Sequence, residues 1–341
     1  MNNKEQSVNI AIVASCGIGD GLLLMIMANN LQRNGYTVTF YSNPISQLKD
    51  WVSGFTIQPW PEKKDLNKNF SKFDLIIADE TSAITDTDLN GQDDEWMQKC
   101  VFLMLIFNKV RRDSKFNYKQ YLYDTVKDKH KLQKLLQLVK VNGCAATPLA
   151  TNTSVVENTT KLCQEVLQLT DVVSDNGLLP LKSLSYRKHN NRVIIHPMGN
   201  NLRARWCPQQ FVKLASLLQK QGWQPVFCVS PTERPEWQAR INDKFLLPEF
   251  ASVSDLAAFI YESGFMIGND SGTGHLASCL KIPTLSIWRK KDVRLRPGWF
   301  IGGVVLPYRF PVRYHKLWPY SVPVRKVLKG FKTLVDHCAF L

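Results

Sequence analysis

Short apolar, β-branched runs alternate with stretches of helical periodicity along the whole chain. The runs that predict strands lie at 8–14, 37–41 and 74–78, and then at 192–196, 224–229, 265–267 and 283–288. The periodic stretches predict helices near 20–34, 119–140 and 155–169, and then near 208–221, 233–242 and 254–263. Such alternation is typical of parallel βαβ units. The sequence therefore predicts an α/β fold.

A polar stretch rich in Asp, Ser, Asn, Gly and Pro separates the two halves and is the best candidate linker, over 171–191. A chain of 341 residues is long enough for two domains of ordinary size. We therefore expect one domain over 1–170 and a second over 192–323. The remaining residues, 324–341, predict a final helix, and the apolar run 101–107 predicts a buried strand or helix because it is too short to span a bilayer.

A glycine-containing turn, Ser15 to Gly21, follows the first predicted strand. It nearly matches the G-x-G-x-x-G dinucleotide fingerprint, but Leu22 occupies the third glycine position and no acid follows the second strand. Asp20 instead stands inside the turn, where open α/β sheets bind ligands. A carboxylate there can act as a general base toward an acceptor hydroxyl. The alternative interpretation is an ordinary helix N-cap.

A second turn, Gly268 to Ser278, joins a predicted strand end to a short helix that begins near Leu276. The start of a helix presents backbone N–H groups and a positive dipole end, which suit a phosphate. Asp270 would repel a phosphate placed directly on it, so we expect it to accept hydrogen bonds from sugar hydroxyls. Here too the alternative is an Asp or Ser N-cap on an ordinary helix.

A third turn follows the strand that ends at His196, and it contains Gly199, Arg203 and Arg205 before a helix that starts at Pro208. The planar guanidinium of arginine binds phosphate oxygens through two parallel hydrogen bonds. Both arginines are therefore candidate phosphate ligands, although arginines in a Gly/Asn loop can also be simply solvated.

These turns, in this order, resemble glycosyltransferase family 9, the ADP-heptose:lipopolysaccharide heptosyltransferases. The first family motif is matched by Gly17-Ile18-Gly19-Asp20. The middle motif is similar to His196, Gly199 and Arg205-Trp206-Cys207-Pro208, and the last motif is matched by Asp270-Ser271-Gly272-Thr273-Gly274-His275. The resemblance spans roughly residues 8 to 290.

The resemblance implies the GT-B architecture, in which two Rossmann-like domains face a central cleft. The domain over 1–170 would then lie on the acceptor side, the domain over 192–323 would bind the nucleotide sugar, and the helix over 324–341 would pack back toward the first domain. Asp20 takes the position of the catalytic base. The implied donor-binding residues are Gly19, Gly199, Arg203, Arg205, Asp270, Ser271, Gly272, Thr273, Gly274 and His275.

The implied reaction moves a heptose from ADP-heptose to a lipopolysaccharide core or a related anionic glycan. The family usually carries a lysine before its Trp-Pro pair, and here Arg203 and Arg205 both stand near that position. Which arginine contacts phosphate is therefore open. A different nucleotide sugar or acceptor is the alternative within the family. Outside it, a nicotinamide-dependent oxidoreductase is disfavoured by the incomplete fingerprint.

Basic residues are concentrated near the C-terminus, where residues 289–332 carry twelve Lys or Arg and one acid, and so supply +11 of the net +14. Aromatic residues are interleaved with them. Such a segment suits an anionic membrane surface or a phosphorylated acceptor. Candidate surface residues are Lys290, Lys291, Arg294 and Arg296. A non-catalytic nucleic-acid-binding or membrane-binding protein is the alternative, and nucleic acid is disfavoured because no recognised binding motif is present.

The eight cysteines lie far apart and form no C-x-x-C pair, so neither a zinc site nor a disulfide framework is predicted. Scattered cysteines are typical of a reducing compartment. We therefore expect a cytoplasmic enzyme, peripheral at the inner face of the inner membrane, that needs no metal and no cofactor besides its nucleotide-sugar substrate.

Overall fold

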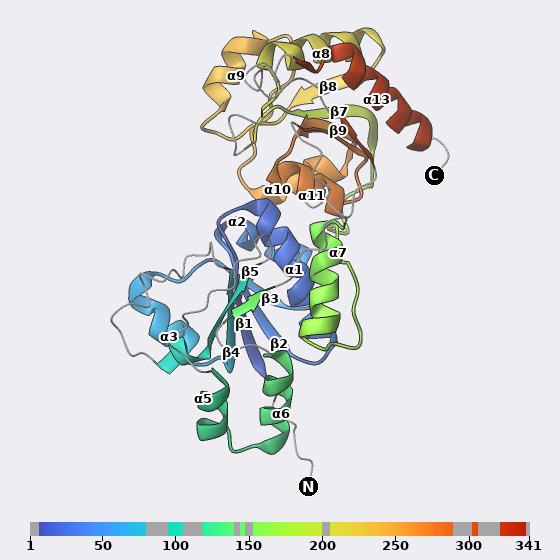
Figure 1. Ribbon diagram of the computed structural model, residues 1–341. Helices are drawn as coiled ribbons and strands as arrows, with labels where there is room; N and C mark the ends of the chain where they lie inside the picture. The colour runs from blue at the N-terminus through green and yellow to red at the C-terminus, as the bar shows by residue number, and fades with distance from the viewer. Residues whose placement is uncertain are drawn as a thin grey trace. The chain divides into compact units, whose positions relative to one another are not determined.

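The computed structural model describes residues 7–79, 95–104, 118–139, 144–146, 153–199, 205–288, 302–305 and 321–338. The chain divides between Leu179 and Pro180 into two compact units, here called the N-terminal and C-terminal units (Figure 1). Each unit contains one sheet in which every pair of neighbouring strands is parallel. The predicted α/β class is confirmed.

The N-terminal sheet has the strand order β3-β2-β1-β4-β5-β6. Its strands are β1 (Asn9–Val13), β2 (Thr37–Tyr41), β3 (Thr56–Gln58), β4 (Leu75–Asp79), β5 (Cys100–Met104) and β6 (Cys144–Ala146). The chain adds strands outward from β1 on one side and then outward from β4 on the other. The direction of winding therefore reverses between β1 and β4, and open α/β sheets bind ligands at such a switch point, outside the carboxyl ends of the strands.

The helices of this unit are α1 (Ile18–Arg33), α2 (Asn43–Ser46), α3 (Leu66–Phe70), α5 (Tyr118–Thr125), α6 (Lys129–Leu138) and α7 (Val155–Lys161). The unit also contains the short 3₁₀ helices η1 (Lys49–Trp51), η2 (Lys63–Asp65) and η3 (Glu95–Lys99). A π-helical turn, η4 (Leu162–Val166), follows α7. Helices α1 and α7 lie side by side (Figure 1).

The prediction of one continuous helix over 119–140 is wrong, because two separate helices occupy this stretch. Helix α5 ends at Thr125, and α6 starts anew at Lys129. Asp128 is the N-cap of α6, because its carboxylate accepts hydrogen bonds from the backbone N–H groups of His130, at 2.9 Å, and Lys131, at 3.0 Å. An Asp in this role favours a new helix start over continuation of the preceding one.

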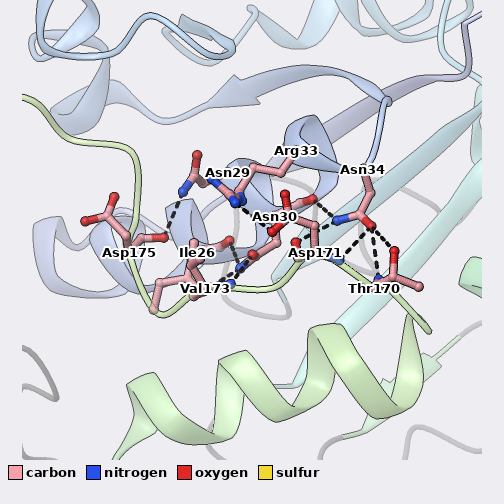
Figure 2. A network of polar contacts seen from close by, with 9 residues as sticks. All are labelled: Ile26, Asn29, Asn30, Arg33, Asn34, Thr170, Asp171, Val173 and Asp175. Atoms are coloured by element: carbon pink, nitrogen blue, oxygen red, sulfur yellow. Dashed lines mark hydrogen bonds and ion pairs between the residues drawn. The ribbon is translucent and has the colours of Figure 1, made fainter.

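Asn30 of α1 and Asn34, the C-cap of that helix, bind the segment that follows η4 to the N-terminal unit (Figure 2). Asn30 is fully buried and exchanges two hydrogen bonds with the backbone of Val173. Asn34 contacts the backbone of Thr170 and Asp171. Residues 170–179 therefore belong to the N-terminal unit, and only the rest of the expected linker lies beyond the boundary. Such side-chain contacts replace the hydrogen bonds that a segment without regular structure would otherwise make to water.

The C-terminal sheet has the order β11-β10-β9-β7-β8. Its strands are β7 (His189–His196), β8 (Gln224–Phe227), β9 (Ser263–Asn269), β10 (Thr284–Ile287) and β11 (Gly302–Val305). The order, counted within this unit, is that of a flavodoxin-like sheet, with its switch point between β7 and β9.

The helices of the C-terminal unit are α8 (Pro208–Lys220), α9 (Arg234–Ile241), α10 (Val253–Tyr261), α11 (Gly272–Cys279) and α13 (Val324–Cys338). Figure 1 shows α8 and α13 on one face of the sheet and α10 and α11 on the other. Helices cover both faces because strands of a parallel sheet are apolar on both sides.

The apolar face of α13 packs within the C-terminal unit. Val327, Phe331 and Leu334 join the core cluster of this unit, and the Phe331 ring meets that of Trp223 edge-on at 5.1 Å. The helix is strongly amphipathic, so its apolar face has to be buried. Within this unit the face contacts α8, β10 and β11, and the packing of 324–341 toward the first domain stays a prediction.

Candidate functional site

The first candidate residue, Asp20, lies in the first turn of α1, directly after β1. The N-cap of this helix is Gly17, and Asp20 is the third helical residue, so the N-cap interpretation of Asp20 is wrong. Gly19, the other predicted residue of this turn, lies beside it. Asp20 therefore stands at the carboxyl end of β1, at the switch point of the N-terminal sheet.

The carboxylate of Asp20 is held tightly against the turn. The hydroxyl of Ser15, a buried residue, donates a hydrogen bond to Oδ2 of Asp20 over 3.3 Å. A Cβ atom on Gly17 would come within 2.7 Å of the same oxygen. A side chain at position 17 would therefore displace the carboxylate of Asp20, and glycine leaves it in place.

Burial raises the pKa of Asp20, the negative charge of Asp79 raises it further, and the Ser15 hydrogen bond lowers it. Desolvation and a like charge both disfavour an ionised carboxylate. A general base is most effective when its pKa approaches the working pH. The surroundings of Asp20 therefore raise its pKa, which is the direction that suits a general base.

Asp79 is a functional candidate that the sequence analysis missed. It is the last residue of β4, the strand that pairs with β1, and it is 9% exposed. The strand was predicted to end at residue 78, one position short of Asp79. A carboxylate at the end of an otherwise apolar strand was the signal that could have identified it, because strand ends in parallel sheets carry ligand-binding residues.

In the C-terminal unit, the ends of β7 and β9 bring two of the predicted turns together. A Cβ atom on Gly199 would lie 2.8 Å from the backbone oxygen of Asp270. The turn after β7 can therefore approach the turn after β9 this closely only with glycine at position 199. These turns meet at the switch point of the C-terminal sheet, where ligand binding is expected.

His196, the last residue of β7, is neutral at physiological pH because burial lowers its pKa. Its Nδ1 atom lies 2.7 Å from the backbone oxygen of Cys228. A carbonyl can only accept, so Nδ1 carries the proton and donates a hydrogen bond to the backbone carbonyl of Cys228, and Nε2 is an acceptor.

Arg205 is anchored at the base of the same turn. Its Nε donates to the backbone oxygen of Gly199 over 2.7 Å, and its terminal nitrogen lies 3.8 Å from Oε1 of Glu233. The side chain is about one-quarter exposed. Glu233 was not identified as a site residue in the sequence analysis. It directly precedes α9, and a carboxylate at that place is typical of an ordinary helix start. The guanidinium of Arg205 is thus held through its nitrogens by Gly199, Glu233 and the sulfur of Met198, on a side chain that stays partly exposed.

The turn after β9 opens helix α11 with Ser271 as its N-cap, and the Ser271 hydroxyl accepts a hydrogen bond from the Gly274 N–H over 3.3 Å. The backbone N–H groups of Gly272 and Thr273 come before any intrahelical acceptor. They therefore lie where a phosphate is stabilised by the helix start. Asp270 precedes the cap and is exposed, so the capping role belongs to Ser271 and not to Asp270.

His275 closes the predicted motif in the first turn of α11. Burial lowers its pKa to about 4, so it is neutral near pH 7. In the part of the chain that the structure describes, its Nδ1 is buried without a hydrogen-bond partner.

Five predicted residues lie outside the described residues: Arg203, Lys290, Lys291, Arg294 and Arg296. Within the described ranges, no group of three or more His, Cys, Asp or Glu side chains is placed to bind a metal ion. None of the helices described here is long and apolar enough to cross a membrane.

The model of glycosyltransferase family 9 (heptosyltransferase) matches residues 113–300, more than half of the chain. No curated protein matches the chain in sequence. Among solved structures, the heptosyltransferase WaaC of E. coli in complex with ADP is similar to this chain with a TM-score of 0.67 at 14% identity, over 96% of this chain and 100% of WaaC. WaaC has also been solved with ADP-2-deoxy-2-fluoro heptose.

The ADP-heptose lps heptosyltransferase II of E. coli has a TM-score of 0.64 at 14% identity, over 97% of this chain and 99% of that enzyme. The iron-containing dodecameric glycosyltransferase TibC of enterotoxigenic E. coli H10407 has a TM-score of 0.53 at 9% identity, over 99% of this chain and 78% of TibC. At these identities the likeness shows a shared fold, which agrees with the predicted GT-B class.

Proposed function

The chain belongs to glycosyltransferase family 9, and from this we propose that it transfers a heptose from ADP-heptose to a lipopolysaccharide core or a related anionic glycan. One observation supports this proposal most directly. The C-terminal sheet carries Gly199, Arg205 and the Ser271–Gly274 turn together at its switch point. A basic side chain beside a capped helix start suits a diphosphate.

The nucleotide assignment follows from what related folds bind. WaaC was solved with ADP and with an ADP-heptose analogue. We propose that this chain uses the same donor class, with Arg205 and the start of α11 on the diphosphate and Asp270 on the sugar hydroxyls. An exposed carboxylate accepts hydrogen bonds from hydroxyl groups, whereas it would repel phosphate oxygens.

In the proposed reaction, a hydroxyl oxygen of the acceptor attacks the anomeric carbon of the donor sugar. The bond between that carbon and the β-phosphate oxygen breaks, and ADP leaves with the bond's electron pair. Asp20 takes the proton of the acceptor hydroxyl. The neighbouring Asp79 and the buried setting of Asp20 support this role, since both raise the pKa of its carboxyl group.

The proposal includes an anionic acceptor and attachment to an anionic membrane face from the cytoplasmic side. The excess of basic residues over 289–332 supports it. Within the described part of that segment, α13 exposes Arg325, Lys329 and Lys332. Basic side chains near anionic lipid contribute about 1 kcal/mol each.

The decisive experiment is a binding and transfer series on the purified chain. Isothermal titration with ADP, UDP and GDP should give clear heat only with ADP, and ADP-heptose should raise the melting temperature more than ADP-glucose. ADP release should then require both ADP-heptose and a lipopolysaccharide precursor. Absence of ADP binding, or equal release with and without acceptor, would reject the proposal.

We further propose that transfer needs no metal ion and no cofactor. The same release assay with EDTA checks this point. Unchanged turnover supports it, and activity that is lost with EDTA and restored by magnesium, manganese or iron contradicts it.

A further inference from the structure

Asn269, the last residue of β9, joins the two ends of the turn that follows β7. Its side-chain Nδ2 donates to the backbone oxygen of Pro197 over 2.7 Å. Its Oδ1 accepts from the backbone N–H of Trp206 over 3.0 Å. The residue is 2% exposed. A single buried amide therefore binds the strand-side and helix-side ends of the segment from Pro197 to Trp206, which carries Gly199 and Arg205.

The two bonds use both kinds of atom in the amide. A side chain at this position has to donate to a carbonyl on one side and accept from an N–H on the other, and the amide of asparagine does both with fixed geometry. Asparagine is also a poor strand former. Its presence at the end of an otherwise apolar buried strand therefore calls for a specific interaction, because burying an unpaired amide costs about 1–3 kcal/mol.

The same two hydrogen bonds link the neighbours of Arg205 to the turn after β9. Asn269 is adjacent in sequence to Asp270, and Trp206 is adjacent to Arg205. Arg205 in turn holds the Gly199 carbonyl at 2.7 Å, and the Gly199 backbone lies against the Asp270 carbonyl. The far end of the segment is also fixed, since the buried Trp206 indole donates to the Val322 carbonyl over 2.9 Å.

We propose that Asn269 is a positioning residue for donor binding, which holds the Arg205 guanidinium in register with the start of α11 so that both meet the same diphosphate. This inference rests on the proposed function and adds to it the residue that aligns the two phosphate-binding elements. Such alignment matters because a displacement of about 1 Å can lower the rate roughly a hundredfold.

The test is a double-mutant cycle on ADP affinity, measured by calorimetry with the full chain. Arg205→Ala should weaken ADP binding roughly tenfold or more. Asn269→Ala should weaken it by a comparable factor. The double variant should be within about twofold of Arg205→Ala alone, because the positioning residue has nothing left to position.

Asn30→Ala is the matched control. Asn30 is also a buried asparagine that clamps a distant backbone with both amide atoms, but it does so at Val173 in the N-terminal unit. It should lower the melting temperature without changing ADP affinity. Hydrogen exchange should show faster exchange of the Trp206 amide in Asn269→Ala and no change in Asn30→Ala.

The melting temperature of each Asn269 variant shows whether it folds, and Asn269→Asp is the second variant. It keeps the acceptor for the Trp206 N–H and loses the donor to Pro197, so ADP binding should still weaken while the Trp206 amide stays protected. The proposal is overturned if both Asn269 variants bind ADP like the wild type while Arg205→Ala does not, or if the two losses simply add. If Arg205→Ala itself binds ADP normally, the phosphate role in the proposed function fails instead.

Discussion

The hydroxyl of Ser15 donates a hydrogen bond to Oδ2 of Asp20 over 3.3 Å, from a position that is 2% exposed. The bond joins the end of β1 to the first turn of α1. It favours the ionised form of Asp20 and so lowers its pKa, against burial and the charge of Asp79, which raise it. The carboxylate is thus oriented by one neighbour and kept basic by others.

Replacement of Asp20 by Asn should lower the transfer rate by about 10²–10⁴-fold, because the variant keeps the shape of the side chain and loses the proton acceptor. ADP affinity should stay nearly unchanged, because the proposed diphosphate contacts, Arg205 and the start of α11, lie in the C-terminal unit. Turnover measured by ADP release and affinity measured by calorimetry check the two halves. A variant whose transfer rate stays within about threefold of the wild-type rate would contradict the role of Asp20 as the base.

Replacement of Asp79 by Asn should move the acidic limb of the kcat/KM profile to lower pH. A general base works in its ionised form, so activity is lost as the pH falls through the pKa of that base. The negative charge of Asp79 raises the pKa of Asp20, so its removal lowers that pKa. Profiles of kcat/KM against pH for the free enzyme report the change directly.

The control for this shift is Asp74→Asn, which changes a carboxylate just before the other end of β4. Asp74 accepts from the Asn9 N–H at 2.9 Å and pairs with Lys131 at 2.8 Å. Its loss should reduce stability and leave the acidic limb in place. If the acidic limb of the kcat/KM profile does not move in Asp79→Asn, Asp79 does not influence the pKa of the base.

Replacement of Arg205 and Asp270 by Ala should weaken donor binding in different ways. Arg205→Ala should weaken ADP and ADP-heptose alike, by roughly 10- to 100-fold, because it removes a charge-assisted contact to phosphate. Asp270→Ala should weaken the nucleotide sugar far more than free ADP. Calorimetric titration of each variant with both ligands measures the split, and equal loss of free ADP in both variants would refute this division of roles.

Replacement of Asn30 by Ala should destabilise the N-terminal unit by about 1–3 kcal/mol, because it removes a fully buried amide and leaves partly buried backbone groups of Val173 without partners. Asn34 makes similar contacts to Thr170 and Asp171 from a partly exposed position. Asn34→Ala should therefore cost less, since water can replace the lost bonds. Urea unfolding of the two variants gives the comparison, and an equal or larger loss in Asn34→Ala would contradict the burial argument.

Reversal of Lys290, Lys291, Arg294 and Arg296 to Glu should reduce sedimentation with anionic liposomes and raise the KM for the acceptor. Donor affinity should change much less. Wild-type binding should weaken with added salt, because exposed charges are screened beyond about 8 Å at physiological ionic strength. If the wild type does not sediment with anionic liposomes at low salt and the variant keeps its acceptor KM, these residues form only a solvated surface.

The sequence by itself determined seven of the parallel strands and where the ligand-binding turns begin, whereas the short strands β3, β6 and β11 were not predicted and β5 lies in a run predicted as buried strand or helix. Long apolar runs such as Val8–Ala14 have one favourable environment, the inside of a sheet covered on both faces. The glycines and acids directly after them then mark strand-to-helix turns. Asp20 and the Asp270–His275 motif could be predicted in this way because their signals are local, within a few residues of a strand end.

Only the tertiary structure decided which turns lie together and which side chains hold them there. The strand order puts Asp79 beside the end of β1, although 59 residues separate it from Asp20 in the sequence. Asn269 binds partners 63 and 72 residues away, and α13 covers the sheet of its own unit. Contacts of this kind leave no periodic pattern in the chain, because they depend on the order in which strands pair and on backbone atoms, which are the same for every residue.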